Sequence, residues 1–227
     1  MFDGCTIAIA AFARDFCERH DRLNILLNNG GVVNLEKFSR TPEGREMHMG
    51  TNHLGHFALP GRLFSILAAT ENARVVTVSS AAYRSGAIDF DDLDWQVRTY
   101  DRVKAYGDIK IANLLFMHAL QSRFEAAGSS AISVAAHPGL TGTERQQSIG
   151  IGGALAHWVA SPVEKGVRSQ LLASTDPSVR GGEFYGPRFG VLGRPMLQTP
   201  KPEAVDSETS RDLWRVSEEL TGVAYPA

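Results

Sequence analysis

Residues 73–80, ARVVTVSS, decide the fold predicted for this chain. The β-branched run inside this segment is typical of a strand, and its unbroken apolar character indicates burial on both faces of a sheet. Two similar runs stand before and after it, LNILLN at residues 23–28 and AISVAAH at residues 131–137. We therefore expect three buried strands.

Helical patterns separate these strands. Thr41 followed by Pro42 resembles a helix N-cap with proline at the first helical position, and an interruption is expected between Gly50 and Gly55. The Pro-rich segment 193–210 is expected to be an exposed loop. The order of elements predicts an α/β fold, a doubly wound parallel sheet of Rossmann-like type, as one domain over residues 1–227. Helices are expected at residues 6–20, 41–69, 103–127, 161–174 and 207–221.

Composition limits the classes of partner. The chain has 227 residues, a net charge of −2 and no Lys/Arg run, so neither nucleic acid nor an anionic membrane is an expected partner. The apolar stretch near the start, TIAIAAFA, is too short to span a bilayer and lacks the basic flank of a secretory signal. Cys5 and Cys17 lie on one predicted helix and cannot bridge within it. A reduced, cytoplasmic setting is expected.

Each predicted strand ends in small or polar residues. The first runs into Asn28, Asn29 and Gly30, the second into Ser80, and the third into a His-Pro-Gly turn. Each of these signals is weak alone, because Asn-Gly and Pro-Gly are common turn formers. The carboxyl ends of parallel strands meet at one edge, however, and ligands bind beyond that edge. We therefore expect a ligand cleft there.

Tyr106 stands four residues before Lys110, so both side chains leave one face of the helix predicted at 103–127. Alone the pair could be two surface residues. It could equally be a proton donor beside its cation, if other residues converge on it. An ammonium about 4 Å from a phenol, at an effective dielectric near 20, would lower the phenol pKa by about three units.

Five segments together resemble one enzyme family. They are ILLNNGG, TPEGREMHMGTNHLGHF, ARVVTVSSAAYRSG, YGDIKIANLLF and AAHPGLTGT. With them the chain resembles the short-chain dehydrogenase/reductase family, in its retinol-dehydrogenase-like branch, from about residue 10 to the end. The resemblance implies NAD or NADP as cofactor, and interconversion of an alcohol, lipophilic in this branch, with a ketone or aldehyde.

The resemblance also implies residue roles. Tyr106 would be the general acid/base, Lys110 its activator, Ser80 the carbonyl anchor and Asn52 the holder of a proton-relay water. Residues 140–227 would form the substrate-side region and tail, and pairing through the helices that carry Asn52 and Tyr106 permits a homodimer. The cofactor would lie along Asn28, Asn29, Gly30, Tyr106, Lys110, Pro138, Gly139, Thr141 and Thr143.

The chain departs from the family pattern at three places. The Gly-rich turn T-G-x-x-x-G-x-G, which holds the cofactor pyrophosphate in the family, is absent before residue 23. We therefore expect an N-terminally truncated fold, weak NAD(P) binding, and an open sheet edge at the strand 23–28 unless residues 1–22 cover it. The residue that chooses between NAD and NADP also belongs to that segment. Ile109 stands where the family has Ser, and Gly31 where Ala is usual.

The same residues permit other interpretations. A non-catalytic remnant or interaction module of the same fold would have lost cofactor binding. Ser80 with His137 and an Asp could form a hydrolase triad, but no G-x-S-x-G elbow accompanies them. The clustered histidines 48, 53 and 56 could hold a metal, although no Cys or carboxylate has matching spacing. The GIGG segment at 150–153 is interpreted as a hinge rather than a phosphate loop.

Overall fold

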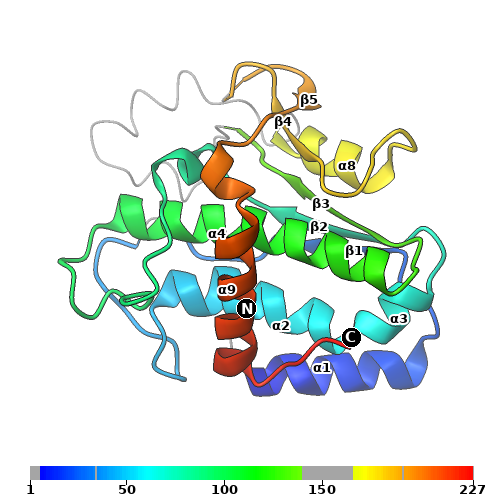
Figure 1. The fold of residues 1–227 in the computed structure, drawn as a ribbon, viewed down its shortest axis with the longest axis horizontal. Helices are drawn as coiled ribbons and strands as arrows, with labels where there is room; N and C mark the ends of the chain where they lie inside the picture. Colours follow the sequence, from blue (N-terminus) through cyan, green and yellow to red (C-terminus); the bar gives the residue numbers. More distant parts are fainter. Residues whose placement is uncertain (1–5, 34, 140–165, 191, 227) are drawn as a thin grey trace.

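The computed structural model describes residues 6–33, 35–139, 166–190 and 192–226 (Figure 1). Their sheet has the order β1-β2-β3-β4-β5, in which the first four strands are parallel and β5 is antiparallel to β4. The predicted parallel α/β sheet is confirmed. The strands are β1 (Ile25–Asn28), β2 (Arg74–Val78), β3 (Ile132–Ala136), β4 (Phe184–Pro187) and β5 (Pro195–Leu197).

The helices follow the expected order. Asp101 caps α4, because its carboxylate accepts the N–H groups of Val103 and Lys104 at 2.9 and 3.2 Å. Gly222, at φ +64°, ends α9 in the left-handed conformation that glycine favours. The helices are α1 (Thr6–Arg19), α2 (Gly55–Arg62), α3 (Phe64–Ala69), α4 (Arg102–Ala126), α8 (Arg168–Thr175) and α9 (Ser207–Thr221), with a π-helical turn η1 (Met49–Leu54) and 3₁₀ turns η2 (Ala81–Ser85) and η3 (Pro202–Ala204).

The helix start predicted at Thr41 is wrong. Gly44, at φ +85°, closes a turn in which its N–H donates to the carbonyl of Thr41 at 2.9 Å. The helical segment starts after Glu46, whose carboxylate accepts the N–H of Met49 at 2.8 Å. A tight turn at residues 41–44 therefore takes the place of the predicted helix start, and the Glu46 carboxylate caps the helical segment that follows. The interruption expected between Gly50 and Gly55 is present as the π-helical turn η1.

Side chains alternate between the two faces of the sheet. On β2, Val75 packs into the core with Phe57 and Phe116, whereas its neighbour Val76 packs with Ala173 of α8. Helices α2 and α4 therefore cover one face, and α8 covers the other (Figure 1). Helix α9 crosses α4 on its outer side, where Trp214 stacks on Phe116 with ring centroids 5.8 Å apart.

Strand β1 lies at one edge of the sheet and pairs with β2 alone among the described strands. Its Leu26 packs into the core under α2, and α1 packs on that same side. Ile25 and Leu27 point to the other face and are 44% and 41% exposed. The prediction that residues 23–28 form a buried strand is therefore wrong for Ile25 and Leu27, because α1 covers only the side of β1 on which Leu26 lies.

Candidate active site

The predicted site residues converge at the carboxyl edge of the sheet. Asn28 ends β1, Ser80 follows β2 by two residues, and Pro138 follows β3 by two residues. The Ser79 hydroxyl donates to the carbonyl of Lys110 at 2.8 Å, which fastens the end of β2 to the first half of α4. The fold therefore brings three strand ends and one helix together, as the sequence predicts.

Ser80 and Tyr106 are neighbours at this edge. Ser80 caps η2 by accepting the N–H of Ala82 at 3.3 Å, and its side chain lies close enough to Tyr106 to act against the rise in the pKa of that phenol. The two segments approach closely because Gly86 meets Gly107 backbone to backbone, where a β-carbon on Gly86 would overlap the Gly107 carbonyl. This glycine contact places Tyr106 beside Ser80.

Lys110 is buried one turn further along α4, with 6% of its surface exposed. Its Nζ donates to the carbonyl of Val78 at 2.9 Å and lies over the Tyr106 ring, 5.4 Å from the ring centroid. No carboxylate in the described residues pairs with it. Burial lowers the pKa of Lys110 to about 8. The amine is therefore still mostly charged at neutral pH.

The expected lowering of the Tyr106 pKa is wrong for this structure. Burial raises the pKa of Tyr106, and the hydrogen bond from Ser80 opposes that rise only in part. The ammonium of Lys110 lies over the ring face and spends one N–H on Val78, so desolvation outweighs its attraction. Tyr106 is consequently protonated at neutral pH, which suits it to donate a proton.

Asn52 lies inside η1, buried and fastened to the loop after β1. Its Oδ1 accepts the N–H of Val32 at 2.8 Å, and its Nδ2 donates to the Val32 carbonyl at 2.7 Å. A β-carbon on Gly31 would come 2.5 Å from that Oδ1. The glycine at position 31, where the family has alanine, therefore gives room to the side chain of Asn52. Segment η1 also contacts α4.

A histidine that sequence reasoning weighed only as a metal ligand holds the first strand end. His56 Nε2 lies 2.7 Å from the Gly30 carbonyl, and its own carbonyl accepts Asn28 Nδ2 at 3.0 Å. Burial, and then the charge of Lys110, lower the pKa of His56 to about 3. The neutral imidazole therefore donates from Nε2 to Gly30. Asn29 is exposed, and its N–H donates to Leu27 at 3.0 Å.

The third strand end carries Pro138 and Gly139, the latter at φ +75°. The Gly139 N–H donates to His137 Nδ1 at 3.2 Å, and the His137 ring packs against Phe184. Burial lowers the pKa of His137 to about 4. Thr141 and Thr143 lie outside the described residues, as do the GIGG segment and the first part of the helix predicted at 161–174.

The described residues do not bring the hydrolase or metal constellations together. His137 is bonded to Gly139 rather than to Ser80. The ring nitrogens of the three clustered histidines go to separate partners, Glu46, Ser217 and Gly30. Among the described residues no group of three or more His, Cys, Asp or Glu side chains could hold a metal ion.

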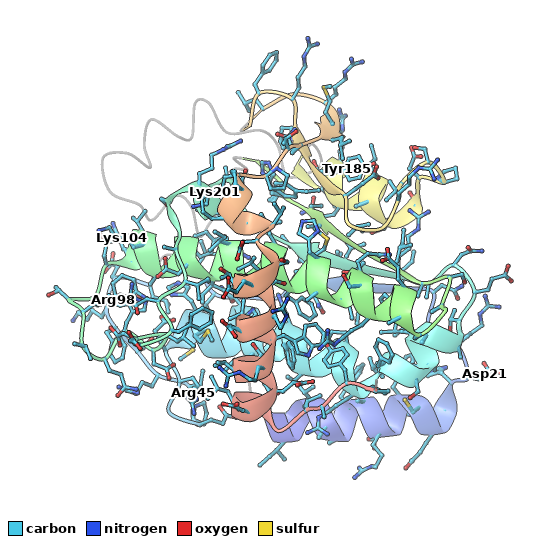
Figure 2. The ribbon with its side chains drawn as sticks, viewed as in Figure 1. Asp21, Arg45, Arg98, Lys104, Tyr185 and Lys201 are labelled. Carbon is cyan, nitrogen blue, oxygen red and sulfur yellow. The ribbon has the colours of Figure 1, made fainter. Side chains whose placement is uncertain are left out.

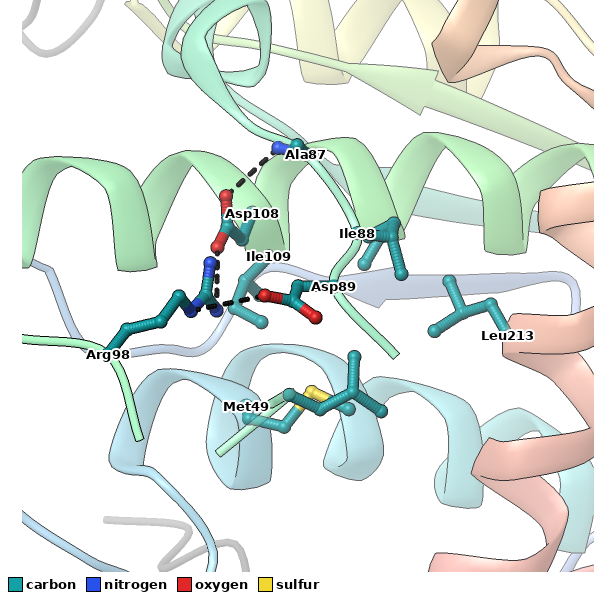
Figure 3. Close-up of a pocket in the computed structure, with 10 residues that line it drawn as sticks. Met49, Ala87, Ile88, Asp89, Arg98, Asp108, Ile109 and Leu213 are labelled. Carbon is teal, nitrogen blue, oxygen red and sulfur yellow. Dashed lines mark hydrogen bonds and ion pairs between the residues drawn. The ribbon is translucent and has the colours of Figure 1, made fainter. Parts of the chain in front are cut away.

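A loop over the start of α4 is clamped by Arg98. Its guanidinium lies 3.5 Å from Asp108 and 3.5 Å from Asp89, while Asp108 also accepts the N–H of Ala87 at 2.9 Å (Figure 3). Beside the clamp, Ile109 packs into an apolar cluster, which accounts for an aliphatic residue where the family has serine. The other members of that cluster are Met49, Leu54, Leu93 and Leu220.

Comparison with curated proteins finds clear relatives, while no family model matches the chain. The chain is 36% identical over 230 residues to human retinol dehydrogenase 13, covering 97% of this chain and 67% of that protein. It is 31% identical over 225 residues to the short chain dehydrogenase/reductase dpchH of Colletotrichum higginsianum, covering 90% of this chain and 56% of that protein. The chain therefore spans about two thirds or less of these relatives' length.

Solved structures agree with these relatives. A crystal structure of an uncharacterized protein from Mycobacterium paratuberculosis is 36% identical, with a TM-score of 0.81, and the match covers 99% of this chain and 75% of that chain. An NADPH-bound carbonyl reductase from chicken fatty liver shares the fold at 20% identity, with a TM-score of 0.58 over 86% of this chain and 75% of that chain. In the described part of the present chain, no helix has the length and apolar character needed to cross a membrane.

Proposed function

Because this chain belongs to the short-chain dehydrogenase/reductase family, we propose that it interconverts a carbonyl compound and an alcohol with NAD or NADP at the Ser80–Tyr106–Lys110 site. One observation carries the proposal: Tyr106 lies beside Ser80 and the buried ammonium of Lys110, at the edge where parallel sheets bind ligands. The relatives named retinol dehydrogenases support a lipophilic aldehyde, ketone or alcohol as substrate.

The residues at this edge fit the nicotinamide end of such a cofactor. Gly30 is exposed, and no atom lies within 4 Å of the position a β-carbon would take, so a ring can approach its backbone closely. Lys110 uses one N–H on Val78 and has two more to donate, and Asn28 Oδ1 has no hydrogen-bond partner among the described residues. The nicotinamide supplies the hydride when it is bound.

Proton chemistry falls to Tyr106 and Ser80. A carbonyl oxygen held between their two hydroxyls would receive a hydrogen bond from Ser80 and the proton from Tyr106 as negative charge develops on it. The ammonium of Lys110 would then stabilise the phenolate left on Tyr106. The oxygen and the nitrogen of the Asn52 side-chain amide both bind the Val32 backbone. A water that relays the proton to Tyr106 would therefore bind the Asn52 backbone or the second hydrogen of its amide nitrogen.

The raised pKa of Tyr106 favours one direction. A phenol that keeps its proton at neutral pH can donate it to a carbonyl, whereas alcohol oxidation requires the phenolate. We therefore expect carbonyl reduction to be the faster direction near neutral pH.

Product formation tests the proposal. The purified chain is incubated with retinal, or with a smaller aldehyde or ketone, and millimolar NADH or NADPH, and the alcohol is measured by chromatography. Ser80→Ala should lower the rate about 10²- to 10³-fold, as the loss of an oxyanion donor does. Ser85→Ala is the matched control, because it removes an exposed hydroxyl from the same 3₁₀ turn. Absence of alcohol with every carbonyl and both cofactors would instead favour the non-catalytic remnant.

A further inference from the structure

A buried acid–base pair stands behind Tyr106, outside the group of residues assigned to the chemistry above. The side chains of Glu46 and His48 are 1% and 0% exposed, and His48 Nδ1 lies 2.9 Å from Glu46 Oε1. The other carboxylate oxygen accepts the Met49 N–H at 2.8 Å. In the Nδ1–H tautomer the His48 ring donates to Oε1, so both oxygens of Glu46 then accept a hydrogen bond.

The pair is anchored from a second segment. The Glu46 N–H donates to Asp94 Oδ1 at 2.9 Å, and the other oxygen of Asp94 binds Arg45 at 2.8 Å. The Tyr100 hydroxyl lies 3.5 Å from His48 Nδ1. The loop between η2 and α4 therefore holds Glu46 and His48 in place through Asp94 and Tyr100.

His48 contacts the candidate proton donor directly. The rings of His48 and Tyr106 meet edge to face, with centroids 5.8 Å apart. His48 Nε2 is buried and has no hydrogen-bond partner among the described residues. A buried polar atom without a partner costs about 1–3 kcal/mol. Core packing alone would favour an apolar ring here, so the imidazole needs another explanation.

We infer that Glu46 and His48 are a positioning pair for Tyr106: Glu46 fixes the ring and tautomer of His48, and His48 fixes the Tyr106 ring so that its hydroxyl stays at Ser80. The inference rests on the proposed function, in which that hydroxyl gives up its proton. Lys110 lies over the Tyr106 ring and the imidazole contacts it edge to face, so cation and imidazole together restrict its rotation.

The electrostatic consequence can be measured apart from activity. Among the described residues, the titratable groups around the His48–Tyr106 contact are Glu46, Tyr100 and Lys110. Burial is the largest cause that raises the pKa of Tyr106. Removing the imidazole admits water to the Tyr106 ring, so the Tyr106 pKa should fall toward its ordinary value of about 10.

The experiment compares His48→Asn with His118→Asn. Asparagine keeps a donor for Glu46 but loses the ring. His118 lies on α4, away from Tyr106, and its Nε2 also lacks a partner among the described residues. Tyrosines labelled with ¹³C at Cζ are titrated by NMR in the cofactor-free protein, and Tyr106→Phe assigns the Tyr106 signal among the 5 tyrosines. The Tyr106 pKa should fall in His48→Asn and stay at the wild-type value in His118→Asn.

Carbonyl reduction is measured on the same variants. His48→Asn should lower turnover about ten- to a hundredfold, in line with a small misplacement of a reacting group, with KM for the carbonyl unchanged. If His48→Asn does not fold, Glu46→Gln serves instead. It weakens the contact that holds the His48 imidazole against the Tyr106 ring, so the Tyr106 pKa should also fall.

A wild-type Tyr106 titration in the folded variants would overturn the inference. Wild-type turnover in His48→Asn would overturn it as well. If the wild-type chain reduces no carbonyl, the proposed function fails, and the titration still decides whether the pair positions Tyr106.

Discussion

At the scale of single residues, the site depends on a lysine that is costly to bury. The folded-state pKa of Lys110, about 8, lies below its ordinary 10.5 because burial disfavours the charged amine. The folded protein therefore binds this proton less tightly than the unfolded chain does. Below about pH 8, burial of Lys110 therefore lowers the free energy of unfolding. This penalty becomes smaller as the pH rises from about 8 to about 10.5, because the amine then loses its proton in the unfolded chain as well. A destabilising charge kept beside Tyr106 points to function rather than stability.

The substitution Lys110→Met should separate the effect of the lysine on stability from its effect on catalysis. The variant should gain about 1–3 kcal/mol in the free energy of unfolding at pH 7, because a buried charge is replaced by an apolar chain of similar length. The Val78 carbonyl loses its bond from Lys110 in this variant but keeps a donor, because Asn113 Nδ2 also donates to it at 3.3 Å. The gain should shrink toward pH 10, while carbonyl reduction is lost at every pH.

Urea unfolding at pH 7 and pH 10 measures this effect, and Lys104→Met provides the control with an exposed lysine on the same helix (Figure 2). Loss of stability in Lys110→Met at pH 7, or a gain that does not depend on pH, would contradict the account of the buried amine.

At the scale of elements, the geometry depends on how closely α4 approaches the segment around η2. Gly86 and Gly107 make that contact without side chains. Lys201, labelled in Figure 2, reinforces it by donating to the Gly86 carbonyl at 2.8 Å. The spacing between Ser80 and Tyr106 is thus set by two glycines that do no chemistry themselves.

Gly86→Ala should disturb both stability and the site. The backbone of Gly86 has a φ of −81°, which alanine adopts readily, so any effect comes from the added methyl group. That group meets the Gly107 carbonyl and should cost about 1–3 kcal/mol in overpacking. Tyr106 should move away from Ser80, and carbonyl reduction should fall.

Gly55→Ala is the control, because its β-carbon would make only ordinary contacts of 3.5 and 3.7 Å. Chemical unfolding and the rate of alcohol formation are measured on both variants. Equal stability and equal rates for the two would show that the η2–α4 contact does not set the site.

The sequence predicts those elements whose signals are local. Strand β2 is visible as a β-branched run, and Tyr106 and Lys110 are visible through their helical spacing. Strand β4, read as FYGP, was not predicted because its Gly and Pro resemble a turn, and pairing with β3 overrides that signal. Strand β5 falls inside the segment expected to be a loop, and it exists only because it pairs with β4.

Part of the site could not be predicted for the same reason. The contacts of His48 with Tyr106 and of His56 with Gly30 join segments far apart in the sequence. No local pattern marks them. The rise in the Tyr106 pKa likewise depends on burial that only the folded chain produces.

At the scale of the whole molecule, two surfaces bear on how the chain works. Helix α9 lies across α4 and contacts η1, with Ser210 donating to the Leu115 carbonyl at 2.9 Å and the Tyr225 hydroxyl donating to the Phe57 carbonyl at 2.6 Å. Helix α9 therefore occupies part of the surface of the two segments that carry Asn52 and Tyr106. The second surface is the exposed face of the edge strand β1, where Ile25 and Leu27 are accessible to solvent.

The 227 residues of this chain predict weak binding of the nicotinamide cofactor. They include the residues proposed above for the nicotinamide end but contain no Gly-rich turn for the two phosphates. Lacking several charge-assisted hydrogen bonds, each worth about 1.5–3 kcal/mol, a protein made of these residues should bind NADH and NADPH in the millimolar range. Calorimetric titration measures this affinity. Micromolar binding of either cofactor would mean that other residues hold the phosphates.

The central claim is that Tyr106 delivers the proton to a carbonyl oxygen, and single-turnover reduction with Tyr106→Phe tests it most directly. The variant loses one hydroxyl and keeps the ring against His48 and Lys110. Tyr185→Phe is the control, since its hydroxyl binds Glu183 instead. We predict that Tyr106→Phe forms no detectable alcohol at saturating NADPH while its cofactor affinity stays at the wild-type value. Alcohol formation by Tyr106→Phe at the wild-type rate would contradict the claim.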